Sequence, residues 1–532
     1  MIDLLIYNAI IRTNDPARPI ASAIAIQRDR IVALGGVQLE GIASANTKRL
    51  DAGGAAILPA FCDAHIHWAW TARNMSQIDL FDVPSRAEAV ERVGRAASRA
   101  EGGKWLVGFG WAQGMWRDAA FPTAADLDAV SPNNPVVLSA RSGHASWCNS
   151  LALNLAGIGD STENPKGGEI QRDAQGRATG ILFEEAMSLV SRQVPKATTE
   201  EIAAAVEAAQ PHAWRAGIGA MHDFDWQDAF AAYDLMRQRG TLGIRMLKQI
   251  NDPEIPAAYA AGFRSGFGDD WLRIGALKIF ADGALGSVTA QMIEPYNGQP
   301  TNRGIVVTPK ARIMELVLEA TRRGFHSTVH AIGDEAVRHV LDVFESARAL
   351  ENSLGIPRDA RRHRIEHVQV IHPDDARRLA ELGIIASIQP IHATADYQAA
   401  DRLWGDRARL GYNARVQLDY GARVAFGSDS PVEPFAPLGG IHAAVTRRRA
   451  DGSPGPDGWY PEARLTVDEA IRGFTEGPAW AAGMEDRLGR LAPGYLADLV
   501  MLDADLHAIV PHSILGVNVL GTMVGGDWKF RA

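Results

Sequence analysis

The stretch WLRIGALKIFADG, residues 271–283, is followed by ARIMELVLEATRRG (311–324), FHSTVHAIGD (325–334) and EAVRHVLDVFESARAL (335–350). Short apolar runs here alternate with longer stretches of helical spacing. The alternation continues through HRIEHVQVIHP (363–373), DDARRLAELG (374–383), IIASIQP (384–390) and ARVAFGSDSPV (422–432). Strands that alternate with helices over this length predict a parallel α/β fold. A chain of 532 residues has room for a (β/α)₈ TIM-like barrel with accessory pieces.

Both chain ends differ from this middle part. Short β-type runs separated by turn residues occur in LLIYNAIIRT (4–13) and again in VNVLGTMVGGDWKF (517–530). We therefore expect residues 1–57 and 488–532 to form one small β-sandwich domain, and residues 58–487 to form the barrel. A Trp- and Gly-rich region, about 71–196, breaks the alternation after the first barrel strand and is expected to be an insertion.

Composition limits the classes of partner and compartment. The formal net charge is -9, from 54 basic and 63 acidic residues, and no segment is strongly basic, which disfavours nucleic acid and anionic membranes as main partners. No apolar run approaches the roughly 20 residues that span a bilayer. The N-terminal sequence lacks the marks of a secretory signal, and the chain has only two cysteines, Cys62 and Cys148. These features predict a cytoplasmic protein that acts on a small molecule, and a symmetric homodimer is the expected assembly.

The strongest local motif is AILPAFCDAHIHW, residues 56–68. An apolar strand ends in His65-Ile66-His67, and residues i and i+2 of a strand point to the same face. Both imidazoles can therefore reach one ion, and imidazole is a good zinc ligand. Taken alone, the pair is equally compatible with two unrelated polar residues at a strand end.

Four further residues favour the metal-site interpretation of this motif. His330 ends the run FHSTVH, His367 ends HRIEH and Asp429 ends ARVAFGSD, while Lys278 lies in the apolar run IGALKIFADG. The carboxyl ends of the strands of a (β/α)₈ barrel form its active-site face. Singly, each residue has a structural explanation, such as a snorkelling lysine or an Asx turn. Together, and in this order, they predict a metal site.

The order HxH, Lys, His, His, Asp resembles the metal set of the amidohydrolase superfamily. Flanking segments resemble one branch, the amidohydrolase 3 or YtcJ-like family, which is related to N-substituted formamide deformylase. The matching stretches are LPAFCDAHIHW (58–68), GHASWCNSLAL (143–153), KIFADGALGSVTA (278–290), TVHAIGDEAV (328–337), residues 364–396, residues 424–448 and PGYLADLVMLD (493–503). Two departures are AFCDAH, where the family usually has Gly-Phe-Ile or Gly-Leu-Ile before the Asp, and FTEGPAWAAG (474–483).

The resemblance implies a ligand set. His65, His67 and Asp429 would bind one divalent ion, His330 and His367 a second, and a carboxylated Lys278 would bridge them. Some superfamily members hold one ion, and some use Glu as the bridge. Glu184 and Glu185 are candidates for that alternative, although a capped helix start is the preferred interpretation. Zinc is the expected metal, with one or two ions.

The implied reaction is hydrolysis of a C–N bond in an amide, formamide or cyclic amide. A metal ion lowers the pKa of bound water toward about 7, and Asp429 is expected to take a proton from that water and return it to the leaving amine. Hydrolysis of an ester, lactone or carbamate at the same site is the alternative. A metal-stabilised protein without catalysis, serving regulation or binding, is the alternative from another class.

Three residues are candidates for substrate binding. Asp282 follows Lys278 by four positions and would contact the substrate or hold the loop. His144 and Trp111 lie in the expected insertion. Trp68, Trp70 and Trp116 could also line an apolar pocket, although Trp residues are mostly part of the core.

Overall fold

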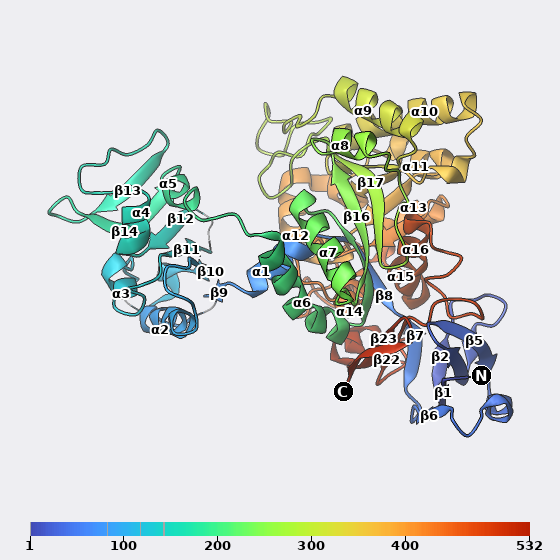
Figure 1. Ribbon diagram of the computed structural model, residues 1–532. Helices are drawn as coiled ribbons and strands as arrows, with labels where there is room; N and C mark the ends of the chain where they lie inside the picture. The colour runs from blue at the N-terminus through green and yellow to red at the C-terminus, as the bar shows by residue number, and fades with distance from the viewer. Residues whose placement is uncertain (1, 82, 118, 142–143) are drawn as a thin grey trace. The chain divides into compact units, whose positions relative to one another are not determined.

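The computed structural model describes residues 2–81, 83–117, 119–141 and 144–532. The chain divides into two compact units (Figure 1). The barrel unit comprises Met1–Trp70 and Val206–Ala532, and the inserted unit comprises Thr71–Ala205. Among the described residues, no helix combines the length and the apolar character needed to cross a bilayer.

Eight parallel strands form the barrel, as predicted. In chain order they are β8 (Phe61–Ile66), β15 (Ile218–Asp223), β16 (Arg245–Asn251), β17 (Leu272–Phe280), β18 (Ser327–Ala331), β19 (Arg364–His367), β20 (Ile385–Ile388) and β21 (Val424–Phe426). The first and last strands meet near the site, where the Asp429 N–H donates to the His65 carbonyl at 2.7 Å. The barrel is therefore nearly closed.

Helices follow the strands. They are α6 (Thr199–Arg215), α7 (Gln227–Arg239), α8 (Ile255–Ala260), α9 (Lys310–Arg323), α10 (Asp334–Ser353), α11 (Arg378–Leu382), α12 (Pro390–Trp404), α13 (Ala414–Asp419), α14 (Pro437–Thr446), α15 (Val467–Gly473) and α16 (Glu476–Ala482). The α10 helix buries Val337, Val340, Leu341 and Phe344, which share one face at helical spacing. The α9 helix ends at Gly324, whose φ of +86° is a left-handed conformation that favours glycine.

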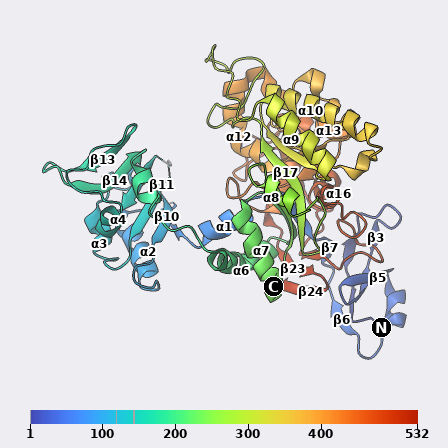
Figure 2. The same ribbon diagram turned by 45° about the horizontal axis from the view of Figure 1, so that its top comes forward.

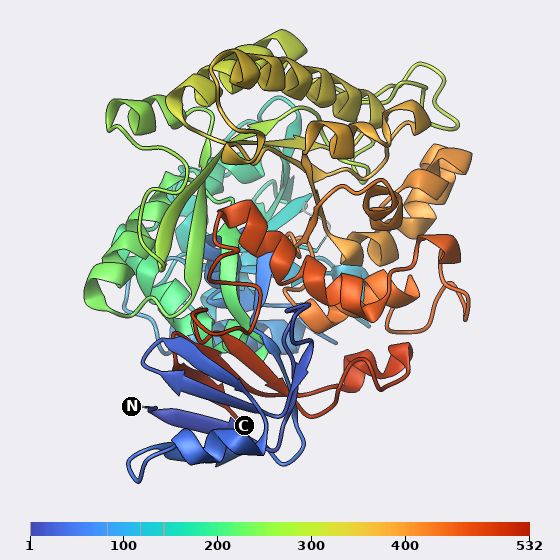
Figure 3. The ribbon, with the colours of Figure 1, turned by 90° about the vertical axis from the view of Figure 1, so that its right-hand side faces the viewer.

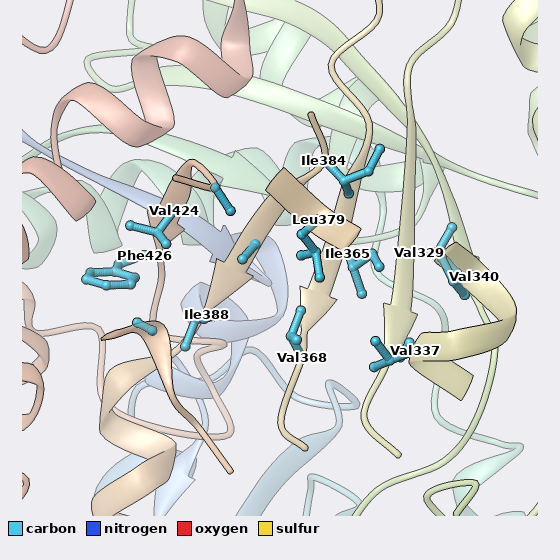
Figure 4. Close-up of a cluster of buried hydrophobic side chains, with 14 of the residues drawn as sticks. Val329, Val337, Val340, Ile365, Val368, Leu379, Ile384, Ile388, Val424 and Phe426 are labelled. Carbon is cyan, nitrogen blue, oxygen red and sulfur yellow. The ribbon is translucent and has the colours of Figure 1, made fainter. Parts of the chain in front are cut away.

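The main core lies between the barrel strands and these helices. Figure 4 shows Val329, Ile365 and Ile388 of the strands beside side chains from α10 and α11. The strands are buried on both faces, which is why their sequences read as continuous apolar runs rather than as alternating ones. The carboxyl ends of the strands are thus fixed by a packed scaffold.

Strands from the two chain ends pair in one of two small sheets, as expected, and they lie side by side in Figure 3. One sheet has the order β5-β4-β1-β6 and the other β24-β23-β22-β7-β2-β3. The strands are β1 (Leu4–Tyr7), β2 (Ile10–Arg12), β3 (Ile20–Ala21), β4 (Ala23–Gln27), β5 (Arg30–Gly35), β6 (Lys48–Asp51), β7 (Ala56–Pro59), β22 (Leu499–Leu502), β23 (Val519–Val524) and β24 (Asp527–Arg531). Ile6 of the first sheet and Leu499 of the second belong to one buried cluster. The domain boundaries 1–57 and 488–532 stay a prediction.

The inserted unit has its own mixed sheet and its own core (Figure 2). Its elements are β9 (Ile78–Asp79), α2 (Arg86–Ala97), β10 (Leu106–Trp111), α3 (Ala124–Asp128), β11 (Val136–Ala140), β12 (Ala145–Cys148), α4 (Ser150–Leu155), β13 (Gly168–Arg172), β14 (Ala178–Glu184) and α5 (Met187–Ser191). Helices α1 (Trp68–Met75) and α6 connect it to the barrel unit. The early insertion expected from the sequence is therefore present.

Candidate metal centre

The carboxyl ends of the barrel strands surround a cavity of about 360 Å³. Its lining includes all six residues expected to bind metal, namely His65, His67, Lys278, His330, His367 and Asp429. Each lies within about two residues of the carboxyl end of a barrel strand or in the turn that follows it, because the strands run parallel and end on one face. The structure therefore brings the six side chains together, and their individual roles as ligands stay a prediction.

His65, His367 and Asp429 form the centre of this group. Each is buried, and each offers one ligand atom within 4.8 Å of the others. Asp429 Oδ1 lies 3.4 Å from His65 Nε2 and 3.5 Å from His67 Nε2. Two imidazoles thus face one carboxylate oxygen across a gap in which a cation would be held.

The outer nitrogens of the imidazoles are held by other side chains. His65 Nδ1 donates to Glu366 Oε2 at 2.5 Å, and His367 Nδ1 donates to Gln389 Oε1 at 2.8 Å. Asp225 Oδ1 lies 3.4 Å from His67 Nδ1. Such partners orient an imidazole and leave Nε2 as the free lone pair, which is the usual arrangement around a metal-binding histidine.

Burial sets the protonation of these groups. It lowers the pKa of His65 and of His367 well below 6.5, and that of His330 to about 3. Burial also raises the pKa of Asp429 to about 6. Neutral imidazoles at His65, His330 and His367 beside a carboxylate form a donor set that binds a divalent cation such as zinc, so the residues present fit the implied metal.

Lys278 and His330 lie in the same cavity. The Lys278 side chain is 1% exposed, and its Nζ lies 4.8 Å and 4.5 Å from the ring centres of Phe224 and Phe280. Burial lowers the pKa of this amine to about 8. The His330 ring centre is 4.6 Å from that of His367, and His330 Nε2 donates to the Gly283 carbonyl at 3.0 Å. The nitrogen of His330 left for a metal is therefore Nδ1.

Two of the expected ligands have an unusual backbone conformation. His367 has a φ of +77° and Asp429 a φ of +60°, a region that non-glycine residues seldom adopt. Strained conformations of this kind cluster at functional sites, where the surrounding structure fixes them. The turn after β21 is additionally held by Asp63, whose Oδ1 accepts from the Ser428 N–H at 3.0 Å.

Gly427→Ala is expected to disturb this turn. A methyl group at Gly427 would lie 2.4 Å from the His65 backbone nitrogen and 2.8 Å from Asp63 Oδ1, so β8 and β21 would have to separate. Overpacking of this kind costs about 1–3 kcal/mol of stability, and we expect the bound metal per chain to fall as well. Chemical denaturation and elemental analysis measure both. Gly439→Ala, with its nearest neighbour at 3.6 Å, is the matched control. Unchanged metal content in Gly427→Ala would show that the contact does not position His65.

Several side chains of the site were not foreseen from the sequence. Glu366 is fully buried one residue before His367 and holds the His65 ring by a hydrogen bond. His392, two residues into α12, also lines the cavity. The signals that could have found them are a carboxylate inside the strand RIEH and the histidine that follows the strand IIASI.

Asp282 has a structural role in the loop after β17. It is 2% exposed, and its carboxylate accepts backbone N–H groups of Gln291, Ile332 and Gly333 at 2.8–3.0 Å. Burial raises its pKa to about 7. Of the two roles expected for Asp282, these contacts favour holding the loop, and substrate binding by Asp282 stays a prediction.

The remaining candidates lie mostly in the inserted unit. Trp111 is fully buried in its core, where Nε1 donates to the Leu138 carbonyl at 2.8 Å, so the side chain presents no surface to a ligand there. His144 is exposed and pairs with Glu184 at 2.9 Å, whereas Gly143 of the same motif lies outside the described residues. Their roles in substrate binding stay predictions.

The other three candidate tryptophans differ in burial. Trp68 and Trp116 are buried, and Trp70 is 49% exposed with its ring centre 5.8 Å from that of His67. Of the four candidate tryptophans, Trp70 is thus the indole that lies beside the metal-site residues.

Glu184 and Glu185 are exposed and precede α5, whose N-cap residue Ala186 has no side-chain cap. The capped helix start expected there is therefore wrong.

Comparisons with known proteins identify the family of the chain. The chain is 32% identical over 546 residues to the protein LONG AFTER FAR-RED 3 of Arabidopsis thaliana, covering 98% of this chain and 91% of that one. It is 30% identical over 558 residues to N-substituted formamide deformylase of Arthrobacter pascens, covering 100% and 99%. A crystal structure of a metal-dependent hydrolase from Pyrococcus furiosus superposes with a TM-score of 0.78 at 28% identity, covering 95% and 99%. The profile of the Amidohydrolase family matches residues 48–528, and the chain is a member of that family.

Proposed function

We propose that the protein hydrolyses a C–N bond of an amide, formamide or cyclic amide with the aid of one or two divalent ions, zinc being the expected metal. The observation that carries this proposal is the buried cluster of His65, His367 and Asp429 at the carboxyl ends of the barrel strands. A purely structural metal site would need no carboxylate facing an open cavity. The similarity to N-substituted formamide deformylase supports formamides as one substrate class.

His65, His67 and Asp429 would hold the first ion, and His330 and His367 a second. When bound, such an ion supplies a Lewis acid and makes a water molecule more acidic. The protein contributes orientation, since Glu366 and Gln389 fix the imidazole rings of His65 and His367. The buried position of the site also strengthens every electrostatic interaction made inside it.

Asp429 is proposed to move the proton. As the water oxygen bonds to the carbonyl carbon of the substrate, one water proton passes to a carboxylate oxygen of Asp429. The C–N bond then breaks, and the same proton passes to the leaving nitrogen. The products are a carboxylic acid and an amine, and the carboxylate is regenerated.

Metal-replete protein tests this function on a matched panel of N-acyl amines, N-formyl amines, cyclic amides and esters. We expect release of amine that is lost on removal of the metal by a chelator and restored by added Zn²⁺. Cleavage of esters without release of amine from any amide would assign the site to ester hydrolysis instead. Full metal occupancy without turnover of any compound would favour the non-catalytic alternative.

Lys278 is proposed to carry a carboxyl group on Nζ and to bridge two ions. Its position in the cavity, between Phe224 and Phe280, supports this role, because an unmodified ammonium would be repelled by divalent cations. A carbamate is anionic and has two oxygens that can ligate.

Lys278→Ala is therefore expected to lose at least one equivalent of metal. Apo-protein reconstituted without CO₂ should recover metal and activity poorly, and added bicarbonate should restore both. Elemental analysis and mass spectrometry of the intact chain follow the change. Lys310→Ala is the control lysine, since Lys310 pairs with Asp342 at 2.6 Å and is not part of the cavity lining. Full reconstitution without CO₂ would exclude the carbamate.

A further inference from the structure

His392 has a polar atom in the cavity without a hydrogen-bond partner among the described residues. The residue is 5% exposed, lies at the start of α12 and lines the same cavity as the metal-site residues. Within the part of the chain that the structure describes, His392 Nε2 has no hydrogen-bond partner. A buried polar atom without a partner costs free energy, so its retention calls for a physical explanation.

The other nitrogen of His392 fixes where the ring proton lies. Gln369 Nε2 donates to His392 Nδ1 at 3.2 Å, and the Tyr412 hydroxyl beside Gln369 donates to Asp396 Oδ2 at 2.7 Å. Because Nδ1 accepts, a neutral His392 ring carries its proton on Nε2. The unpartnered atom is therefore an N–H donor, and an N–H cannot bind a metal.

The donor lies beside the carboxylate that is expected to move the proton. His392 Nε2 is 3.9 Å from Asp429 Oδ2, which is beyond hydrogen-bonding distance, so the two groups border the same space without satisfying each other. The ring of His392 lies nearly parallel to that of His367, at 13° and 6.2 Å between centres. His65 and His367, by contrast, have their outer nitrogens engaged and turn their lone pairs toward Asp429.

We propose that His392 is a further catalytic residue, whose Nε2–H donates a hydrogen bond to the carbonyl oxygen of the substrate as that oxygen becomes negatively charged. This inference rests on the proposed hydrolytic function and names the group that binds the reacting oxygen. A donor placed where charge develops is worth more in the transition state than in the ground state, so it accelerates the chemical step. The matching substrate feature is a carbonyl group within reach of both Asp429 and His392.

Three variants at one position separate this role from others. His392→Ala removes the donor, His392→Asn places its amide near the position of Nδ1, and His392→Gln places its amide near Nε2. We expect kcat to fall about 10²–10³-fold in the Ala and Asn variants, with KM little changed, and to recover partly in the Gln variant. Metal content should equal that of the unaltered protein in all three. His442→Gln, a buried histidine of α14 whose Nε2 lies 3.5 Å from the Thr446 hydroxyl, is the control.

A second measurement does not depend on turnover. A phosphinate in which P–O⁻ replaces the carbonyl of the best amide presents the charged oxygen permanently, and calorimetry gives its Kd. We expect His392→Ala to bind it about 10²-fold more weakly and His392→Gln to regain part of the loss. Thermal unfolding of each variant confirms that it is folded.

The outcomes are distinguishable. Normal kcat and normal phosphinate affinity in His392→Ala would overturn the inference, and so would loss of metal in that variant, which would make His392 a ligand. If the unaltered protein cleaves esters but no amide, and phosphinate binding still depends on His392, the proposed amide specificity fails while the inference holds. If it neither cleaves any compound nor binds the phosphinate, both proposals are overturned.

Discussion

Asp429→Asn is expected to lower kcat by about 10²–10⁴-fold while the protein keeps much of its bound metal. The amide of Asn has nearly the shape of the carboxylate and still offers an oxygen to a cation. It cannot accept a proton from water and return it to the leaving nitrogen. The backbone at Asp429 is fixed without its carboxylate, because the Asp429 N–H is bonded to the His65 carbonyl and its φ of +60° belongs to the turn.

Steady-state kinetics on the best substrate and elemental analysis of the same sample measure the two effects. Asp228→Asn, an exposed aspartate in the first turn of α7, is the control for loss of one negative charge. Near-normal turnover in a metal-loaded Asp429→Asn variant would remove this residue from the proton path. Complete loss of metal would show that its main role is ligation.

Glu366→Gln is expected to destabilise the protein by about 3–5 kcal/mol and to weaken metal binding by about 10–100-fold. Glu366 is 0% exposed, and its Oε2 accepts from His65 Nδ1 at 2.5 Å and from Arg364 Nη2 at 3.1 Å. Among the described residues it is the only carboxylate that forms an ion pair with Arg364. A neutral amide would leave that guanidinium buried without a counter-charge and would loosen the His65 ring.

A second buried triad provides a matched control for Glu366. Glu351 is 1% exposed, accepts from Arg348 Nη1 at 2.6 Å and lies 2.8 Å from His363 Nε2, so it repeats the Arg, Glu, His arrangement outside the cavity lining. Glu351→Gln should also destabilise the apo-protein but should leave the metal Kd unchanged. Urea denaturation and competition with a chromophoric chelator provide the two measurements. Equal metal affinities in the two variants would mean that Glu366 serves stability alone.

The candidate ligands could be predicted from sequence because a parallel barrel converts order along the chain into proximity. A polar residue at the end of an apolar run lies on one face of the barrel, so His65, His330, His367 and Asp429 needed no knowledge of packing. Asp63 and Glu366 are different, because their function depends on partners far away in sequence. His65 and Glu366 are separated by 301 positions, and no local pattern encodes that contact.

Trp111 lies in a local pattern that is visible in the sequence but has two structural interpretations. An aromatic run rich in glycine is compatible with a pocket wall and with a core, and burial depends on what the rest of the sheet covers. In the structure Trp111 packs against Trp116 and Trp147, with ring centres 6.3 Å and 6.2 Å away, and the three indoles form part of the core of the inserted unit. His392 was overlooked because a histidine in the first turn of a helix is ordinary until its partners are known.

The way in which the inserted unit joins the chain has an evolutionary consequence. Strands β8 and β15 pair directly, with Phe61 opposite Ile218 and Ile66 opposite Asp223, although the whole of Thr71–Ala205 lies between them in sequence. The segment therefore interrupts no strand pairing of the barrel, and its own sheet is complete without strands from elsewhere. Recombination at two crossover points, near codons 70 and 206, would exchange this segment between lineages as a single cassette. Descendants of one ancestor can thus diversify in Thr71–Ala205 while inheriting the histidines and Asp429 unchanged.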